Sequence, residues 1–525
     1  MTASFPGHDM SRRQLLRLAG AAGLFAGIGL SASACAGPTG LPGEDTLTLA
    51  LNRSLVSLDN KLNQFDAAVT VQRAVREGLT AIGPEITPIP MLAESFVMLS
   101  PTRWKATLRK GVTYSDGRPV EIKDVSTALQ MYREVQGSFV AGFFPEFPRI
   151  TALDERSFYL DSKAPIPILD ALMALILITP AADNKPEELQ TGVGTGPYTV
   201  ESFNRGAGTY QLLRNERYWG TAPAVQRVNV RFLPEESSRV IALRSGEVDV
   251  IDSISPNSME QLSGLPGVTI ETASSLRMNQ IFYNFRKPSS HPLSDVRVRE
   301  ALSFAIDGQA LVHDVLIDSV EQAQGVTPAS LFGHAKTGDF VYDPAKAKSL
   351  LKDLGVSDLK LKIIWETGEF PSDTAIMEAL VQMFGDIGVR TELQQFEPGG
   401  NILQWRQGKE GDWDLLGNGF SSPTGLAITM LQGMYAGTPE KEKTRDTYQG
   451  YVNKAVAAKI GLAAAEVDEA KREAYLKDAQ QAAWDTWPCA WAFVPKSILA
   501  RRNRVQTLSL SAANSYPLSH IGLEA

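Results

Sequence analysis

Short stretches of alternating apolar and polar residues recur along the chain, a pattern typical of β-strands with one buried face. Other stretches place apolar residues three and four positions apart, which is the spacing of an amphipathic helix. Strands are predicted at 46–51, 104–109, 196–203, 210–214, 227–232, 248–251, 361–365, 389–396 and 490–494. Helices are predicted at 71–78, 122–134, 235–245, 296–316, 343–354, 372–387 and 464–486. Strands that alternate with helices indicate an α/β fold, with a second, separate sheet in the second half.

Glycine, aspartate and proline mark several of the predicted helix ends. Gly246, Gly355 and Gly388 each follow a predicted helix directly, where a left-handed glycine often ends the helix. Asp343 and Pro344 stand where a helix begins, because an Asp side chain caps free N–H groups and proline suits the first turn. The apolar segment 164–179 is too short to span a bilayer unaided, so we expect it to be a buried helix or strand.

The first residues of the chain resemble an export signal rather than part of a folded domain. Arg12 and Arg13 precede an uncharged apolar run at 18–34, which ends in small residues before Cys35. A basic start, an apolar run and a small-residue cleavage site define a signal peptide, and the arginine pair resembles the twin-arginine motif. The residues before Cys35 resemble a lipobox. We therefore expect residues 1–34 to be removed, Cys35 to carry lipid, and residues 35–43 to form a tether.

Composition changes this picture only by excluding some partners. The chain has 525 residues and a formal net charge of −8, with no long basic block. Such a chain is a poor binder of nucleic acid or of an anionic membrane surface. Its two cysteines are Cys35 and Cys489, so a lipid on Cys35 leaves no pair for an internal disulfide. We expect Cys489 to be a small buried apolar residue.

Recognisable catalytic and metal-binding motifs are absent from the sequence. No two histidines are four residues apart, and no Cys-x-x-Cys is present. The glycine-rich stretch 192–197 ends in proline and no apolar helix follows it, which argues against a phosphate-binding loop. The stretch 419–423 begins like the nucleophile elbow of a hydrolase but ends in proline. The sequence predicts neither an enzyme nor a bound cofactor or metal.

Seven motifs occur in one order along the chain, and together they resemble the extracellular solute-binding proteins of family 5. These are the peptide- and nickel-type binding proteins of bacterial ABC importers. The motifs are Leu-Ala-Glu-Ser-Phe at 92–96, Leu-Arg-Lys-Gly-Val-Thr-Tyr-Ser-Asp-Gly-Arg-Pro at 108–119, Gly-Thr-Gly-Pro-Tyr at 194–198, Arg-Asn-Glu-Arg-Tyr-Trp-Gly at 214–220, Ser-Gly-Glu-Val-Asp at 245–249, Asp-Val-Arg-Val-Arg-Glu-Ala-Leu at 295–302 and Tyr-Asp-Pro-Ala-Lys-Ala at 342–347.

The resemblance implies a two-lobed α/β clamp of mixed sheets flanked by helices, with an extra domain inserted in lobe one. Lobe one would hold residues 44–60, 185–273 and 494–525. The extra domain would be 61–184 and lobe two 274–493. The crossings between the lobes, near 273–280 and 488–493, would form the hinge. Ligand would bind between the lobes, and closure would bury it.

The resemblance also implies where ligand contacts come from: the loop after the first strand, the hinge crossings, a tryptophan-bearing segment of lobe two, and the loop after the following strand. Aromatic rings suit a cleft that grips varied side chains by contact area. For Trp405, surface or core packing is an equally good interpretation. The candidate residues are Asp59, Asn60, Arg277, Met278, Asn279, Trp405, Asn418, Phe420, Ser421 and Trp491.

One position departs from the pattern of the peptide binders. Those proteins often carry an Asp that pairs with the free ammonium group of the peptide, and the matching position here, within about two residues, is Ser421. A buried ammonium group needs an acidic partner. Asp59 or Glu366 could supply it. Otherwise the ligand would be a modified peptide, an oligosaccharide, an opine-like compound or a metal chelate.

The resemblance implies a monomeric, exported protein, lipid-anchored to the outer face of the cytoplasmic membrane. It would capture oligopeptides or a related solute and deliver it to an ABC permease and its ATPase. The alternatives are a binding protein for a non-peptide solute, and a sensory or cell-wall regulatory clamp that works without a transporter. An extracellular hydrolase is a third class, against which the missing motifs argue.

Overall fold

The computed structural model describes residues 45–52, 58, 61, 66–83, 85–135, 138, 140–183, 192–204, 206–398, 400–443, 445, 447–508 and 516–524. Five residues singled out in the sequence lie outside these ranges: Arg12, Arg13, Cys35, Asp59 and Asn60.

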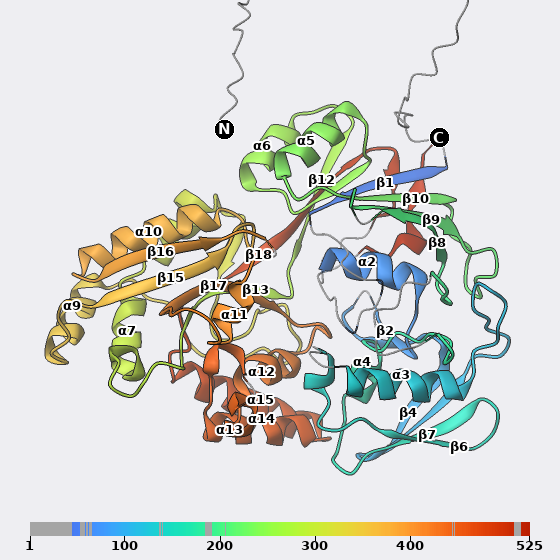
Figure 1. Ribbon diagram of the computed structural model, residues 1–525, viewed down its shortest axis with the longest axis horizontal. Helices are drawn as coiled ribbons and strands as arrows, with labels where there is room; N and C mark the ends of the chain where they lie inside the picture. Colours follow the sequence, from blue (N-terminus) through green and yellow to red (C-terminus); the bar gives the residue numbers. More distant parts are fainter. Residues whose placement is uncertain are drawn as a thin grey trace, which may run out of the picture. The chain divides into compact units, whose positions relative to one another are not determined.

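The largest sheet contains twelve strands drawn from both halves of the chain. The first half supplies β1 (Thr46–Leu51), β8 (Tyr198–Asn204), β9 (Thr209–Arg214), β10 (Arg227–Phe232), β11 (Val250–Asp252) and β12 (Val268–Ser274). The second half supplies β13 (Arg277–Tyr283), β14 (Val320–Gln322), β15 (Lys360–Glu366), β16 (Arg390–Phe396), β17 (Leu415–Ser421) and β18 (Cys489–Arg502). The hydrogen-bonded order is β16-β15-β17-β13-β18-β11-β1-β10-β9-β8, and β12 and β14 pair with β18 (Figure 1).

Strand β1 shows why helices cover both faces of the first-half sheet. Leu47 and Leu49 pack into a core that includes residues of α2 (Asp66–Val75). Ala50, on the opposite face, packs with residues of α5 (Glu236–Ser245) and α6 (Pro256–Ser263). Side chains alternate between the two faces of a strand, so an apolar residue at nearly every position indicates a strand buried on both sides.

The second-half sheet combines parallel and antiparallel strands with flanking helices. Strand β15 pairs in parallel with β16 and with β17. Helix α10 (Asp373–Asp386) packs against β16, and α7 (Val296–Phe304) packs against α9 (Pro344–Asp353). The Asp343 side chain accepts a hydrogen bond from the Lys346 amide at 2.9 Å. The predicted start of this helix is thereby confirmed.

Strand β18 joins the two halves of the sheet. Its first part pairs with β13 from Cys489 to Phe493, and its second part pairs with β12 from Lys496 to Arg502. Figure 1 shows this strand, in red, running from one half to the other. The second half therefore builds its own group of strands, as expected, but this group is not separate, because β18 pairs with strands of both halves and joins them into one sheet. We call the two groups the first-half sheet and the second-half sheet.

A smaller antiparallel sheet lies between β1 and β8 in the sequence. Its order is β4 (Ala93–Ser100), β5 (Arg103–Leu108), β7 (Ser157–Asp161) and β6 (Arg149–Ala152). Helix α3 (Ile122–Glu134) packs against it, and the strands β2 (Thr80–Ile82) and β3 (Pro88–Pro90) form a separate hairpin. The apolar segment 164–179 contains α4 (Leu169–Met173), and its residues are largely buried, as predicted. Among the described helices, none is long and apolar enough to cross a bilayer.

Two predicted helices differ in the structure. The predicted helix 296–316 ends as α7 at Phe304, and a new turn begins where the Asp307 side chain accepts a hydrogen bond from the Ala310 amide at 2.9 Å. The predicted helix 464–486 corresponds to α15 (Glu469–Trp484), which begins five residues later with Asp468 as its cap. The preceding helix α14 (Lys454–Ala465) was not predicted. In both cases an aspartate marks the true start of a helix in the sequence.

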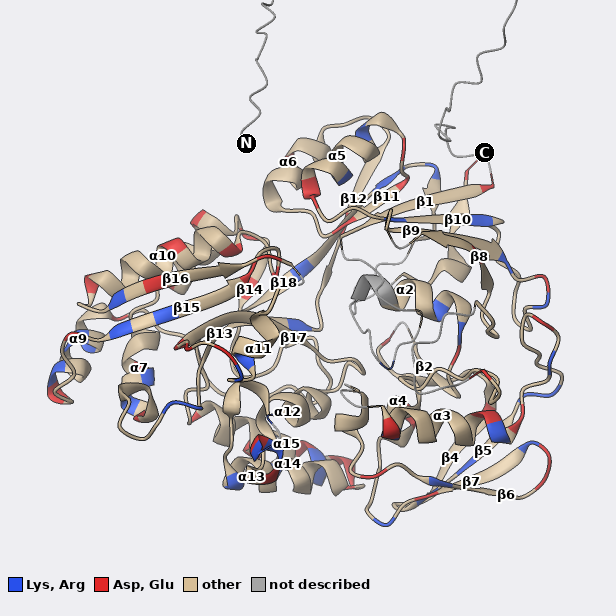
Figure 2. Ribbon diagram, viewed as in Figure 1, with Lys and Arg blue, Asp and Glu red and all other residues tan. Residues whose placement is uncertain are grey.

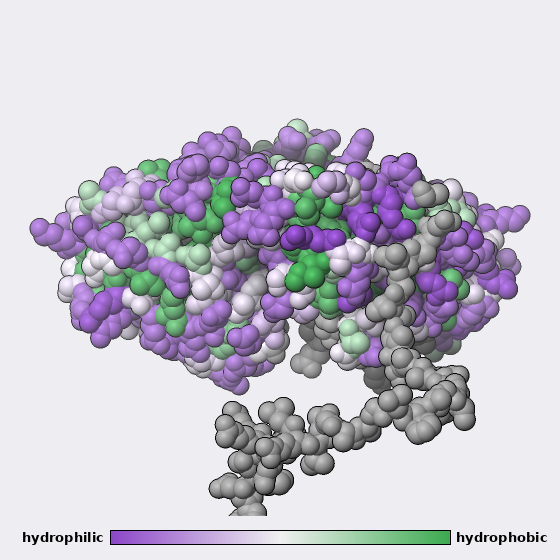
Figure 3. Space-filling view, turned by 90° about the horizontal axis from the view of Figure 1, so that it is seen from above, coloured by the Kyte–Doolittle hydropathy of each residue, from purple (hydrophilic) through white to green (hydrophobic). Residues whose placement is uncertain are grey.

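The remaining elements complete the second half and the C-terminus. These are α8 (Gly308–Ala310), α11 (Ile402–Arg406), α12 (Ala427–Tyr435), α13 (Pro439–Lys443), β19 (Val505–Gln506) and β20 (Gly522–Leu523). Lys and Arg positions alternate with Asp and Glu positions along the described elements (Figure 2). Polar residues cover most of the face seen in Figure 3, with apolar residues in small groups between them.

Candidate functional site

One edge of the second-half sheet gathers the ends of several strands. The parallel strands β15 and β17 finish there, at Glu366 and Ser421. Strand β13 runs antiparallel to β17 and begins at the same edge, since Arg277 is in register with Ser421. Ligands of open α/β sheets bind outside the carboxyl ends of parallel strands. This edge is therefore where a ligand-binding site is expected.

The structure brings most of the sequence candidates into neighbouring strands. Strands β13 and β17 place Met278 beside Phe420, and Asn279 beside Gly419. Across the other side of β13, Asn279 is in register with Phe493 of β18. The candidates on these three strands are Arg277, Met278, Asn279, Asn418, Phe420, Ser421 and Trp491.

An ion pair that the sequence did not reveal lies at this edge. The Arg277 guanidinium pairs with the Glu369 carboxylate, and its Nε donates to the Asn279 side-chain oxygen at 2.9 Å. The Glu369 carboxylate also accepts from the Gly419 amide at 3.3 Å. The Glu369 side chain is 10% exposed and that of Arg277 is 25% exposed. We call Arg277, Asn279, Glu369 and Gly419 the edge cluster.

Gly419 permits the close approach of the arginine. A Cβ atom at this position would lie 2.5 Å from both Nε and Nη2 of Arg277, a distance that real side chains essentially never show. The glycine thus lets the side chains of Arg277 and Asn279 approach the backbone of β17 closely. Glu369 lies three residues beyond Glu366, the acid weighed from the sequence. The tight turn after β15 directs the Glu369 carboxylate toward β17. The spacing of apolar residues in the sequence does not predict such a turn.

Four of the candidates are buried in this structure. Met278 and Trp491 have 0% of their surface exposed, Asn279 has 1% and Phe420 has 6%. The Trp491 indole N–H donates to the Gln322 side-chain oxygen at 3.0 Å, and the Gln322 amide donates to the Phe340 carbonyl at 3.0 Å. Trp491 is therefore anchored beneath the edge. Its partner Gln322 also lines a cavity of about 450 Å³, together with Gln309, Val312, Glu321, Gln324, Asp339 and Phe340.

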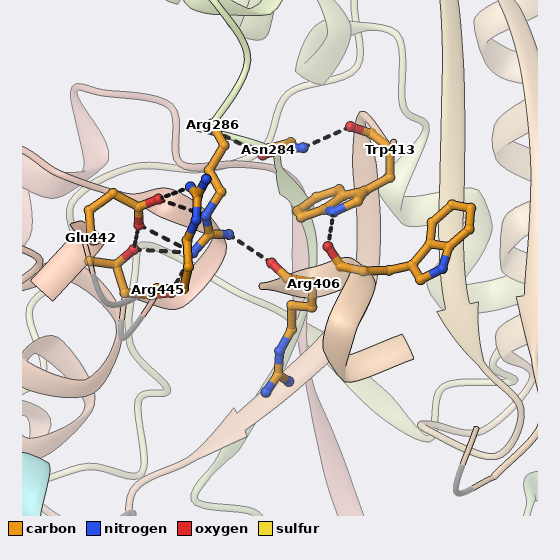
Figure 4. A network of polar contacts seen from close by, with 8 residues as sticks. Asn284, Arg286, Arg406, Trp413, Glu442 and Arg445 are labelled. Atoms are coloured by element: carbon orange, nitrogen blue, oxygen red, sulfur yellow. Dashed lines mark hydrogen bonds and ion pairs between the residues drawn. The ribbon is translucent and has the colours of Figure 1, made fainter. Parts of the chain in front are cut away.

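Trp405 packs over the second-half sheet. Its ring lies edge-on to Phe396 of β16, with 5.3 Å between ring centroids, and the Lys362 ammonium lies 5.8 Å from its centroid. The backbone carbonyl of Trp405 accepts a hydrogen bond from the Trp413 indole at 2.8 Å (Figure 4). The packing interpretation of Trp405 is thus the one its contacts support, although Phe396 ends β16 at the same edge as the cluster.

Tyr448 connects the candidate strand β17 to helix α11. Its hydroxyl lies 3.3 Å from the Asn418 side-chain oxygen and 3.2 Å from the Gly419 carbonyl. Its ring meets that of Phe420 edge-on at 5.6 Å, and the Arg406 guanidinium lies 5.2 Å from its centroid. Burial raises the pKa of Tyr448, so the hydroxyl stays a neutral donor. Sequence reasoning missed Tyr448 because it begins the one-turn helix η4 (Tyr448–Gly450), which carries no motif.

A charged network holds the backbone beneath Trp405 and Arg406. Figure 4 shows Arg286 between Glu442 and the carbonyl of Arg406. Arg286 donates to the Glu442 carboxylate at 2.8 Å and to the Arg406 carbonyl at 2.7 Å. Thr447, next to Tyr448, is bound by the same guanidinium. The network therefore fixes the ends of two segments that reach the edge of the sheet.

The structure places the glycine-rich stretch 192–197 against carbonyl oxygens. A Cβ atom on Gly194 would overlap the Val75 carbonyl at the end of α2, and one on Gly196 would meet the Ala74 carbonyl. Phosphate needs N–H donors, which a helix presents at its N-terminus. Over the described residues, no three His, Cys, Asp or Glu side chains are placed to hold a metal ion. Burial raises the pKa of the Cys489 thiol, so the thiolate is disfavoured.

Comparison with known proteins identifies relatives along nearly the whole chain. The family model "Bacterial extracellular solute-binding proteins, family 5 Middle" matches residues 87–442. The glutathione-binding protein GsiB of Salmonella choleraesuis (strain SC-B67) is 24% identical over 492 residues, which cover 91% of this chain and 94% of GsiB. The probable D,D-dipeptide-binding periplasmic protein DdpA of Escherichia coli (strain K12) is 24% identical over 418 residues, 77% of this chain and 78% of DdpA.

Solved structures show the same fold. The dipeptide-binding protein of Pseudoalteromonas sp. SM9913 in complex with Met-Leu has a TM-score of 0.82 at 17% identity, covering 91% of this chain and 100% of that protein. NikA of Staphylococcus aureus in complex with Ni(L-His)2 has a TM-score of 0.79 at 19% identity, with the same shares covered. The α/β two-lobed fold class expected from the sequence is confirmed by these likenesses. At such identities they speak for the fold alone.

Proposed function

Because the chain belongs to the bacterial extracellular solute-binding proteins of family 5, we propose that it captures a short peptide or a similar amine-bearing solute. It delivers this solute to a membrane permease with an ATPase. It acts as a monomer outside the cytoplasmic membrane, exported through the signal at Arg12 and Arg13 and held there by lipid on Cys35. It does not catalyse a reaction on its ligand.

The proposal divides the chain into the domains expected from the sequence. Lobe one comprises 44–60, 185–273 and 494–525, the extra domain 61–184, and lobe two 274–493. Two chain crossings support this division. Strand β12 ends at Ser274 and β13 begins at Arg277, and β18 changes partners between Phe493 and Lys496. A hinge needs such a small number of crossings, where a few residues absorb the motion.

The observation that carries the proposal is the Glu369 carboxylate beside Arg277. Ser421 provides no acid for a peptide ammonium group, but the Glu369 carboxylate lies against the Gly419 amide, two residues away on β17. Its side chain is 10% exposed, a position in which an ammonium partner would be largely desolvated. Arg277 lies beside it with the charge that a ligand carboxylate needs. In a zwitterionic ligand, the ammonium group would therefore pair with Glu369 and the carboxylate with Arg277, in place of the ion pair between these two residues.

The first test is mass spectrometry of small molecules released when the natively purified protein is denatured. A series of peptide masses, or a single amine-bearing solute, is expected. A single mass without an amine would replace the proposal with the non-peptide alternative. If the cleft is empty, calorimetric titration with a dipeptide panel and with glutathione is the deciding measurement. No heat with any of them would count against peptide capture and favour a sensory or regulatory clamp.

A further inference from the structure

The hairpin between β2 and β3 contacts the loop that follows β17. The hairpin turn is closed by the Gly83 amide, which donates to the Thr87 carbonyl at 2.8 Å. At its tip, Ile86 lies so close to Gly425 that a Cβ atom on the glycine would overlap the isoleucine Cγ2. The Leu276 side chain lies 3.8 Å from the same point. Ile86 and Gly425 are more than 300 positions apart in the sequence.

The backbone of this contact is unusual on both sides. Ile86 has a φ of +58°, a left-handed conformation that is an outlier for a β-branched residue. Gly425 has a φ of +75°, which glycine adopts without strain. A polar residue or glycine would suit the hairpin tip better than isoleucine. The packing contact with Gly425 offsets the backbone strain of Ile86.

A second contact lies next to the first. The short helix η1 (Val140–Phe143) packs against α12, which begins directly after the Gly425 loop. Val140 and Phe143 are 0% and 2% exposed. One continuous apolar cluster therefore includes both the core around α3 and the core of the second-half sheet. The hairpin and η1 belong to the segment 61–184, and Gly425 and α12 belong to 274–493.

The Gly425 loop is rigidly connected to the edge cluster. The Ser422 amide donates to the Leu276 carbonyl at 3.1 Å, directly before Arg277. The Ser422 and Thr424 hydroxyls each lie 2.9 Å from the Thr429 hydroxyl. These hydroxyls tie the loop to the first turn of α12. A displacement of Gly425 would therefore be transmitted to the start of β13 and the end of β17.

We propose that Ile86 seated on Gly425 is a latch that holds the extra domain against lobe two and sets the balance between open and closed forms. The inference rests on the proposed two-lobed clamp, in which ligand stabilises the closed form only through contacts made better there. The contact between Ile86 and Gly425 stabilises the closed form even when no ligand is bound. The backbone strain of Ile86 reduces this stabilisation, so that the ligand-free protein still opens.

The test measures the distance between two spin labels in the full chain carrying Cys35→Ser. Labels attach through Leu153→Cys, in the loop between β6 and β7, and Leu462→Cys on α14, both exposed. Gly425→Ala places a methyl group where Ile86 lies. We expect a shift of the ligand-free population toward longer distances. Ligand affinity should fall several-fold, because part of the binding free energy is then used to shift the equilibrium from the open to the closed form.

Two variants separate the latch from general damage. Gly388→Ala also forces alanine into a left-handed position, φ +84°, but a Cβ atom there meets nothing within 4 Å. It should leave the distance distribution unchanged. Ile86→Ala added to Gly425→Ala removes the overlapping methyl group and should restore most of the shorter-distance population.

The latch is overturned if Gly425→Ala and Gly388→Ala give the same distance distribution. It is also overturned if the Ile86→Ala addition restores nothing. The distance readout needs no ligand. A protein that binds no peptide would therefore refute the proposed ligand class while leaving the latch result readable.

Discussion

Glu369 holds two partners at the edge of the sheet, the Arg277 guanidinium and the Gly419 amide. The variant Glu369→Gln keeps the shape of the side chain and removes its charge. If a ligand ammonium group binds there, affinity for free-amine peptides should fall at least about tenfold, since hydrogen-bonded charges are costly to leave unpaired. Titration calorimetry with a dipeptide and its N-acetylated form measures this.

The N-acetylated peptide is the internal control, because it has no ammonium group and should respond little to Glu369→Gln. Glu392→Gln is the matched protein control. Glu392 also pairs with a cation, Lys362 at 3.2 Å, but its side chain is 68% exposed. Equal losses for the free and acetylated peptides would show that Glu369 acts through protein structure and not through the amine.

Glu77 is a second buried acid, away from the edge cluster. Its carboxylate accepts hydrogen bonds from the Trp219 indole at 2.8 Å and the Tyr218 hydroxyl at 3.1 Å. Burial raises its pKa to about 7 against the opposing effect of these bonds. The native state therefore binds a proton between the unfolded pKa, 4.5, and about 7, where the unfolded state has released it.

Stability from this group should fall as the pH rises from 4.5 through 7, because the native state holds more protons than the unfolded state in that window. The shift corresponds to at most about 3 kcal/mol. The variant Glu77→Gln should remove this slope from the pH profile of the unfolding midpoint. Denaturant titrations at pH 5 and pH 8 measure it. A profile that keeps the same slope would assign the pH dependence to other groups.

At the scale of elements, glycines decide how closely α2 approaches the loop before β8. A Cβ atom on Gly194 would overlap the Val75 carbonyl. The variant Gly194→Ala should therefore destabilise the protein by ~1–3 kcal/mol, the usual cost of overpacking. Gly385→Ala is the control, since Gly385 lies in α10 with nothing within 4 Å of its Cβ position. It should be neutral or stabilising. Equal midpoints for the two variants would contradict this packing.

Local patterns predicted most elements, and they failed where tertiary contacts take over. Gly246, φ +79°, ends α5 as expected, because a left-handed helix end favours glycine and is therefore visible in the sequence. The break after Phe304 and the continuity of β18 depend on partners distant in the sequence. The edge cluster shows the same limit. Arg277 was predicted from the family likeness, but Glu369 approaches Gly419 only through a turn that carries no motif.

At the scale of the whole molecule, the proposed function divides the work between the folded part, which would capture the ligand, and the N-terminal segment, which would set the location. A binding protein that feeds a permease must stay near the membrane. Two acyl chains on a mature N-terminal Cys35 would give stable anchoring, whereas a single chain gives only marginal binding. The apolar run at 18–34 is short for a spanning helix, so the cysteine is the anchor that the sequence offers.

The variant Cys35→Ser should therefore release the exported protein from the membrane fraction while leaving ligand affinity unchanged. Cell fractionation with immunodetection measures the release, and mass spectrometry of the N-terminal peptide should find lipid on the wild-type cysteine. Thr39→Ala, in the tether, is the control and should remain with the membrane. Membrane retention of Cys35→Ser equal to that of the control would mean that the uncleaved apolar run, and not lipid, holds the protein in place.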